Sequence, residues 1–137
     1  MDEQKKDYRV EQDSIGTKDV PKSVYYGVQS LRAAENFHIT GLNMHPEIIN
    51  SLAYIKKAAA ITNCEVGILD KTIADAIVKA CDEILKGKLH DNFIVDPIQG
   101  GAGTSLNMNA NEELRIARLK YLAEKREIIL LLIRMTT

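Results

Sequence analysis

GGAGTSLNMNANE, residues 100–112, joins a glycine-rich turn to a run that is able to form a helix, and the rest of the chain is organised around it. Three glycines in four positions let the backbone turn tightly and let a ligand approach it, because no Cβ stands in the way. Such a loop before a helix directs free N–H groups and the positive end of the helix dipole at one place, which suits an anion. In a plainer interpretation, Thr104 or Ser105 only caps the helix.

Three asparagines follow the loop within five positions, at Asn107, Asn109 and Asn111. Asparagine is a poor residue for a helix interior, because its amide competes for backbone hydrogen bonds. Asn107 and Asn111 are four positions apart and therefore share one helix face. The pattern indicates either a polar site beside the loop or asparagines that simply face water.

The composition indicates one soluble, globular domain. The 137 residues are 45% hydrophobic and 27% charged, which is typical of folded rather than disordered chains. A net charge of −1, without a basic block and with few aromatic residues, argues against a nucleic-acid partner. The longest apolar run, Ile128 to Ile133, is too short to span a bilayer, so no membrane partner is expected.

The cysteines and the N-terminus favour a cytoplasmic protein. Cys64 and Cys81 lie far apart without a C-x-x-C motif, as in reduced cytosolic proteins. Residues 1–7 are polar, contain no signal-peptide core and are expected to fray.

The first third of the chain predicts a hairpin and a short helix. Two extended segments, residues 8–13 and 17–21, surround a turn at Gly16, and Pro21 ends the second strand. Helical spacing then predicts a helix near residues 27–36. Its polar side is either a solvated face or a functional one; it carries Gln29, Arg32 and Asn36.

Two longer helices follow, and both look structural. The first has His45 as its cap and Pro46 at its first position, and it ends before Gly67. Its expected buried stripe is Ile48, Leu52, Ile55, Ala59 and Thr62. The second runs from an Asp70 cap to Gly87. Its expected buried stripe is Ile73, Ala76, Ile77, Ala80 and Ile84.

Residues 89–99 form an irregular connector into the glycine loop. His90 beside Asp91 could indicate proton chemistry, but no nucleophile pairs with it, so a surface histidine is favoured. The three histidines lack the spacing of metal ligands, so no metal site is predicted.

Three separated motifs resemble the aspartase branch of the aspartase/fumarase superfamily. They are YYGVQSLRAAENF at residues 25–37, FIVDPIQ at 93–99 and the glycine stretch at 100–112, and the resemblance runs from about Tyr8 to Glu112. Fumarases carry Gly-Thr-Gln-Ser in the related loop, whereas this chain has Gly103-Thr104-Ser105. The resemblance implies a mainly α fold: a small helical domain with a short N-terminal β-hairpin, here without the family's central helical bundle.

The resemblance also implies an activity, the reversible deamination of L-aspartate to fumarate and ammonia without a cofactor. In that reaction a base removes the Cβ proton, and hydrogen-bond donors hold the extra charge of the resulting aci-carboxylate. By resemblance, Thr104 contacts the substrate, Ser105 and Asn107 lie close by, and Arg32 is a weaker candidate for holding its negative charge. The serine that serves the family as base lies in a segment this chain lacks, so no catalytic residue is assigned and the chain alone is expected to be inactive.

The sequence leaves the family pattern after Glu112. The family continues roughly VIANRALELLG, whereas this chain reads ELRIARLKYL from residue 113. Synonymous codons can be chosen for the residues from Glu113 onward such that one base, inserted after the first G of the Glu113 codon, changes the translation. The new reading is VIANRALEILGREKGDYSSINPND, as an aspartase would continue. We therefore divide the chain into an aspartase-like domain, 1–112, and a helix-permissive tail, 113–137. Our hypothesis is that the tail is read out of frame and ends at a premature stop.

Other interpretations remain beside that of an inactive aspartase fragment. One is a fragment of a fumarate hydratase, and another is a non-catalytic module that joins full-length subunits. Family members are homotetramers, and the apolar run at Ile128 to Ile133 also suggests self-association of the fragment.

Overall fold

The computed structural model describes the backbone of residues 7–136 and the side chains of residues 7–127. The described part contains a two-stranded hairpin, one short 3-10 helix and four α-helices. Their bounds are β1 Tyr8–Gln12, β2 Thr17–Pro21, α1 Val28–Asn36, α2 Pro46–Glu65, α3 Lys71–Leu85, η2 His90–Asn92 and α4 Thr104–Thr136. The predicted fold class, mainly helical with a short N-terminal hairpin, is confirmed.

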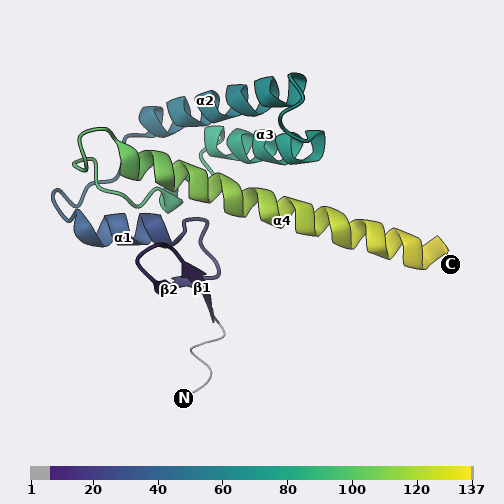
Figure 1. Ribbon diagram of the computed structural model, residues 1–137, viewed down its shortest axis with the longest axis horizontal. Coiled ribbons are helices and arrows are strands. Elements are labelled where there is room, and N and C mark those ends of the chain that lie inside the picture. The colour runs from purple at the N-terminus through teal and green to yellow at the C-terminus, as the bar shows by residue number, and fades with distance from the viewer. Residues whose placement is uncertain (1–6, 137) are drawn as a thin grey trace, which may run out of the picture.

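Helix α4 forms the long axis of the molecule (Figure 1). Helices α2 and α3 lie side by side on one side of it, while α1 and the hairpin lie on the other (Figure 1). The glycine loop leads into α4 at the end of the molecule opposite its C-terminus (Figure 1).

The hairpin has the predicted strands and turn. Its strands pair antiparallel, from Tyr8 opposite Pro21 to Gln12 opposite Thr17. Gly16 has a φ of 141°, which non-glycine residues rarely adopt. The Asp13 carboxylate accepts hydrogen bonds from the N–H groups of Ile15 and Gly16, at 3.0 and 3.1 Å, and so fixes the turn.

The two long helices begin at the predicted caps. Nδ1 of His45 accepts a hydrogen bond from the N–H of Glu47 at 3.2 Å, and Pro46 is the first residue of α2. The Asp70 carboxylate accepts from the N–H groups of Thr72 and Ile73, at 2.8 and 3.3 Å, and so caps α3. Both caps are local, which is why the sequence is enough to place them.

The predicted buried stripe of α2 is wrong. Ile48 and Ile55 are 48% and 61% exposed, Ala59 and Thr62 are exposed, and only Leu52 is half-buried. The residues of α2 that face the core are Ile49, Ala53 and Ala60. Because α2 carries apolar residues on more than one face, its spacing alone does not decide which face packs on α3.

The expected stripe of α3 is mostly correct: Ala76, Ala80 and Ile84 are buried, and Ile73 and Ile77 are half-buried. A single apolar core joins the connector to α2, α3 and the first half of α4. Its buried members are Met44, Ile49, Ala53, Ala80, Cys81, Ile84, Leu89, Phe93, Val95, Leu106, Ala110, Leu114 and Ala117. Cys64 and Cys81 are both free thiols, and burial raises the pKa of Cys81 to about 11.

The helix predicted after the glycine loop continues through the tail to Thr136. Side chains of the apolar run Ile128 to Ile133 lie outside the described residues, as do residues 1–6, for which a frayed tail is predicted. Across the described part, no helix is both long and apolar enough to cross a membrane.

Candidate functional site

The glycine loop is open to its surroundings. Gly103 has a φ of +68°, and its N–H donates to the carbonyl of Gly100 at 2.9 Å, which closes the turn before α4. A Cβ added at Gly100 or Gly101 would meet no heavy atom within 4 Å. The described part of the chain therefore leaves the space beside these two glycines free for a ligand or another chain.

The first turn of α4 is capped by a side chain that the sequence interpretation did not single out. Oε1 of Gln99 accepts a hydrogen bond from the N–H of Leu106 at 2.8 Å, while its Nε2 donates to the carbonyl of Asp96 at 2.9 Å. Within residues 7–127, the hydroxyls of Thr104 and Ser105 make no hydrogen bond. The plainer interpretation, in which one of these hydroxyls caps the helix, is therefore wrong.

The three asparagines have different roles. Asn109 is fully buried: its Oδ1 accepts from the N–H of Ile94 at 3.0 Å, and its Nδ2 donates to the carbonyl of Asn92 at 2.9 Å. It therefore ties α4 to the connector and is structural. Asn107 and Asn111 are exposed on one face, and Oδ1 of Asn107 accepts from Nζ of Lys56 at 2.8 Å.

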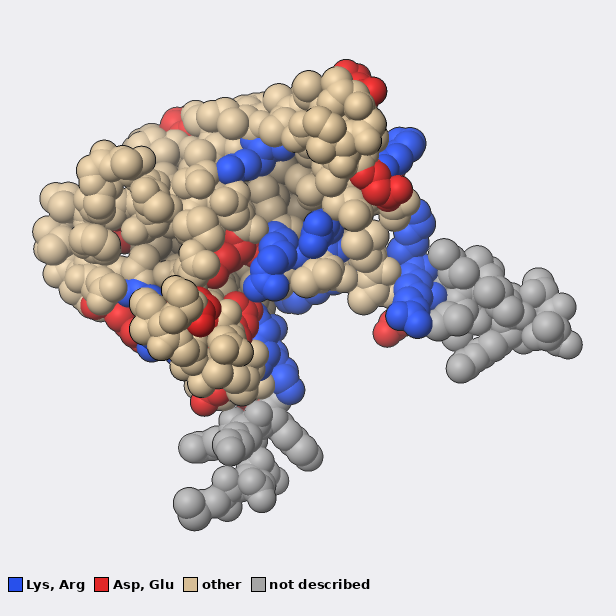
Figure 2. Space-filling model, viewed as in Figure 1, with Lys and Arg blue, Asp and Glu red and all other residues tan. Residues whose placement is uncertain are grey.

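Arg32 is engaged by the hairpin. Its Nε lies 2.9 Å from Oδ2 of Asp13, and its Nη2 donates to the carbonyl of Gly16 at 3.2 Å. The hydrogen bond from Arg32 lowers the pKa of Asp13, so the pair is charged at neutral pH. Within residues 7–127, the hydrogen bonds of Arg32 go to Asp13 and Gly16, and none goes to the glycine loop. In the face that Figure 2 shows, the end of the molecule that carries the loop has few charged side chains.

Glu112, the last residue of the glycine stretch, holds the N-terminus of α1. Its Oε2 accepts from the N–H of Gly27 at 3.0 Å and of Ser30 at 2.9 Å, and also from the Ser30 hydroxyl. Its Oε1 accepts from the N–H of Gln29 at 2.9 Å. A Cβ at Gly27 would lie 2.6 Å from this carboxylate, so only glycine fits there. The residue types alone do not reveal this contact, because the partners are more than 80 residues apart.

Glu11 and Arg9 complete the same junction from the hairpin. Oε2 of Glu11 accepts from the N–H of Val28 at 3.1 Å, and Nε of Arg9 lies 2.8 Å from Oε1 of Glu11. Burial would raise the pKa of Glu11, but hydrogen bonds from Arg9 and from the Val28 N–H outweigh it and lower the pKa. Two carboxylates therefore cap α1, whose first turn contains no acidic residue of its own.

Asp96 fixes the base of the glycine loop. Its buried carboxylate accepts from the N–H groups of Thr40, Gly41 and Ile98, at 2.8, 3.0 and 2.8 Å. Burial alone would raise its pKa, but these backbone hydrogen bonds lower it to about 2. Asp96 thus stays ionised and joins the loop after α1 to the segment that leads into the glycine turn.

His90 has a structural role, but it is less exposed than the surface histidine that the sequence favoured. It is half-buried, and its Nε2 lies 2.9 Å from the carbonyl of Ile84 at the end of α3 and 3.2 Å from Oδ1 of Asn50. The described residues contain no cluster of three or more His, Cys, Asp or Glu side chains that could hold a metal ion.

Solved structures of lyases contain this fold. The chain aligns with a fumarate lyase:delta crystallin from Brucella melitensis in native form at a TM-score of 0.82 and 46% identity, covering 85% of this chain and 27% of that one. It aligns with a class II fumarase from Schistosoma mansoni at a TM-score of 0.78 and 41% identity, covering 81% and 24%. The fold is thus that of part of a fumarase-type lyase.

Sequence comparison is more specific. The family model described as "Lyase" matches residues 16–129, and the chain belongs to that family. The chain is 57% identical over 120 residues to an aspartate ammonia-lyase from Bacillus sp, covering 88% of this chain and 26% of the relative. It is 46% identical over 121 residues to the aspartate ammonia-lyase of Escherichia coli K12, covering 86% and 25%. It therefore spans about a quarter of the length of these relatives.

Proposed function

We propose that this chain is the N-terminal part of an aspartate ammonia-lyase, which converts L-aspartate reversibly to fumarate and ammonia. The observation that carries the proposal is the glycine loop, which presents two free hydroxyls at the start of α4 beside glycines with open space next to them. The aspartate ammonia-lyases among its relatives support this choice of reaction.

In this proposal the loop binds a substrate carboxylate. Because Gln99 caps the first turn of α4, the hydroxyls of Thr104 and Ser105 are available as donors, together with the amide of Asn107. The helix N-terminus adds a positive dipole end at the same place. Preorganised donors of this kind stabilise the aci-carboxylate most, because its charge develops during the reaction. Of the four proposed substrate-binding residues, Arg32 has the least support, since Asp13 already neutralises it.

A chimaera tests the proposed activity. Residues 8–112 replace the matching segment of the Bacillus relative, and fumarate formation from L-aspartate is followed by its ultraviolet absorbance. We expect turnover, and we expect Thr104→Ala in the chimaera to lower kcat/KM by at least about tenfold, the loss of one donor to the developing charge. A folded chimaera without turnover, or an unchanged Thr104→Ala variant, would contradict the proposal.

We expect the isolated chain to show no turnover. We propose that the full-length enzyme is a homotetramer in the cytoplasm. Measurable ammonia release by the purified chain would contradict the first expectation. The fumarase resemblance keeps a hydratase as the second candidate. The same chimaera distinguishes it, because a hydratase would form malate from fumarate and would not require ammonia. Co-elution with a full-length relative would instead favour a non-catalytic module.

The segment from Glu113 onward we propose to be read out of frame. In the shifted sequence, valine would stand at position 113, where the structure has a fully buried glutamate without a partner. A buried position of that kind suits an aliphatic side chain, which supports the shift. The family match extends to residue 129 and so includes part of this tail, which counts against the shift. Sequencing the coding DNA tests this proposal. The DNA downstream of the Glu112 codon must contain a continuous aspartase reading frame that is offset by one base.

A further inference from the structure

Buried polar groups without partners are concentrated in one stretch of α4. Among residues 7–127, all four buried side-chain atoms that lack a hydrogen-bond partner lie after Glu112: both oxygens of Glu113, Nε of Arg118 and the hydroxyl of Tyr121. Buried polar groups in folded proteins are nearly always paired, so three such side chains within nine residues are unusual. This half of α4 is therefore less well matched to the core than the half that precedes it.

Glu113 is the most extreme of the three. It has no exposed surface, and it lies on the same helix face as Ala110 and Ala117, which are buried in the apolar core. Burial alone raises its pKa to about 9, so the carboxyl is protonated at neutral pH. Its neighbour Glu112 provides a contrast, since four donors compensate for the burial of that carboxylate.

The titratable groups around Glu113 offer it no compensating charge. From the segment before α1, the Tyr25 ring lies close by, and Nζ of Lys120 is held 3.6 Å above its centroid. Glu83 of α3 is close to the same ring. The pKa of Tyr25 is raised mainly by burial and further by the charges of Glu83, Glu124 and Glu113. On α4 itself, Tyr121 holds Lys79 at 4.0 Å from its ring centroid. The neighbours are thus carboxyls, phenols and lysines already placed on aromatic rings.

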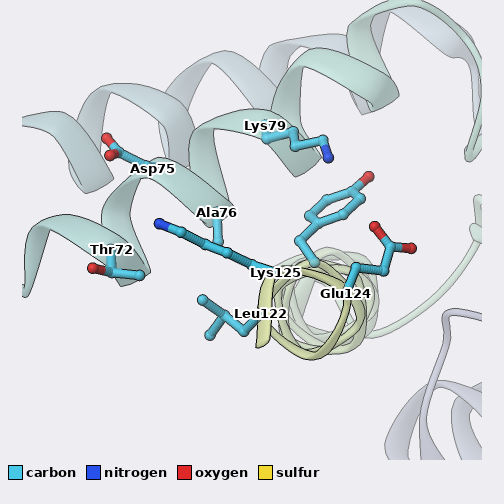
Figure 3. A pocket seen from close by; sticks show the side chains of 8 residues that line it. Thr72, Asp75, Ala76, Lys79, Leu122, Glu124 and Lys125 are labelled. Atoms are coloured by element: carbon cyan, nitrogen blue, oxygen red, sulfur yellow. The ribbon is translucent and has the colours of Figure 1, made fainter. Parts of the chain in front are cut away.

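Beyond the core residues Leu114 and Ala117, the far half of α4 borders a groove on α3. Figure 3 shows the groove between the two helices, with Ala76 on one side, Leu122 on the other, and Lys125 extending towards Thr72. The groove has a volume of about 470 Å³. The first half of α4, in contrast, is tied down by Gln99, Asn109 and Glu112 through hydrogen bonds that do not involve Glu113.

We propose that residues 113–127 dock on the core through a protonated Glu113, and that rising pH releases this half of α4 while the glycine-loop half stays in place. The direction follows from linkage: an acid with a raised pKa when folded binds its proton more tightly in the docked state. Docking is therefore strongest below the ordinary pKa of 4.5 and weakens as pH rises towards about 9. Between these limits, each pH unit increases the opening constant about tenfold.

Native-state hydrogen exchange of the whole chain tests the proposal, with rates corrected for the intrinsic pH dependence of exchange. From about pH 6 to about pH 8, we expect the opening constant of amides in 113–127 to rise about 100-fold. Amides in 104–112 should keep their protection. Glu113→Gln, which removes the titrating group at nearly constant shape, should abolish the rise, and Glu113→Val serves the same purpose if the glutamine variant does not fold. The matched control Glu124→Gln, at an exposed position of α4, should retain it.

Three outcomes would overturn the proposal. The first is protection in 113–127 that does not change with pH in the native chain. The second is a rise that persists in both Glu113 variants, which would assign it to another group. The third is an equal loss in 104–112, because the whole helix would then open as one unit. None of these results bears on lyase activity, so the proposal stands or falls apart from the proposed function.

Discussion

Replacing Glu112 with glutamine is expected to loosen the junction between α1, the hairpin and α4. The Glu112 carboxylate accepts four hydrogen bonds from the first turn of α1. A glutamine keeps one oxygen, which is able to serve Gly27 and Ser30, but it turns an NH2 group towards the N–H of Gln29. The hydrogen bond from the Gln29 N–H is then lost, because two donors face each other there. The other three hydrogen bonds are kept, but their acceptor is no longer charged.

The size of the effect follows from these contacts. A hydrogen bond to a charged group contributes about 1.5–3 kcal/mol, and a neutral one about 1 kcal/mol. Losing one charged bond and weakening three gives an expected loss of at least about 3 kcal/mol. Since small domains are stable by roughly 5–15 kcal/mol, this substitution should be visible as a large fall in stability.

Urea unfolding followed by circular dichroism measures this loss. The matched control is Glu65→Gln, an exposed glutamate at the end of α2, for which we expect a change within about 0.5 kcal/mol. A loss below about 1 kcal/mol in Glu112→Gln, with an unchanged urea dependence, would show that the four hydrogen bonds do not hold α1 in the way the structure indicates.

Three further predictions concern the same part of the molecule. Gly27→Ala should cost about 2–3 kcal/mol in thermal or urea unfolding, because its Cβ would lie 2.6 Å from the Glu112 carboxylate; a neutral effect would contradict that close approach. Gln99→Ala should cost about 1 kcal/mol as a lost helix cap, whereas Thr104→Ala should leave stability within about 0.5 kcal/mol, and the reverse order would refute the assignment of the cap. The contribution of Asp96, whose pKa is about 2 against an ordinary 3.8, should be present above pH 3.8 and disappear as pH falls through about 2. The melting temperatures of the native chain and of Asp96→Asn should therefore converge in acid, and a constant difference would contradict the low pKa.

Local signals in the sequence were enough for most of the secondary structure. The His45 and Asp70 caps act on N–H groups two or three residues away, and Gly16 supplies a backbone conformation that other residues avoid. Such short-range interactions depend only on neighbouring residues, so the sequence alone is enough to place the hairpin, α1, α2 and α3.

The candidate site was predicted only in part. The glycine loop and the start of α4 are where the sequence puts them, and Asn107 lies exposed one turn further on. The cap of that helix, however, comes from Gln99, seven residues before its partner Leu106. Arg32 binds Asp13 instead of extending to the loop, a choice that depends on how the hairpin folds over α1.

The helices, the hairpin, the glycine loop and, through its motifs, the lyase family all follow from the order of the residues. The buried face of α2 depends on packing in three dimensions, because two of its faces are apolar and α3 covers one of them. Only the tertiary structure joined Glu112 to α1 and left Glu113 without a partner. Glu112 and Glu113 are adjacent and chemically the same, but Glu112 lies opposite four N–H and O–H donors, whereas Glu113 lies in the apolar core without a hydrogen-bond partner.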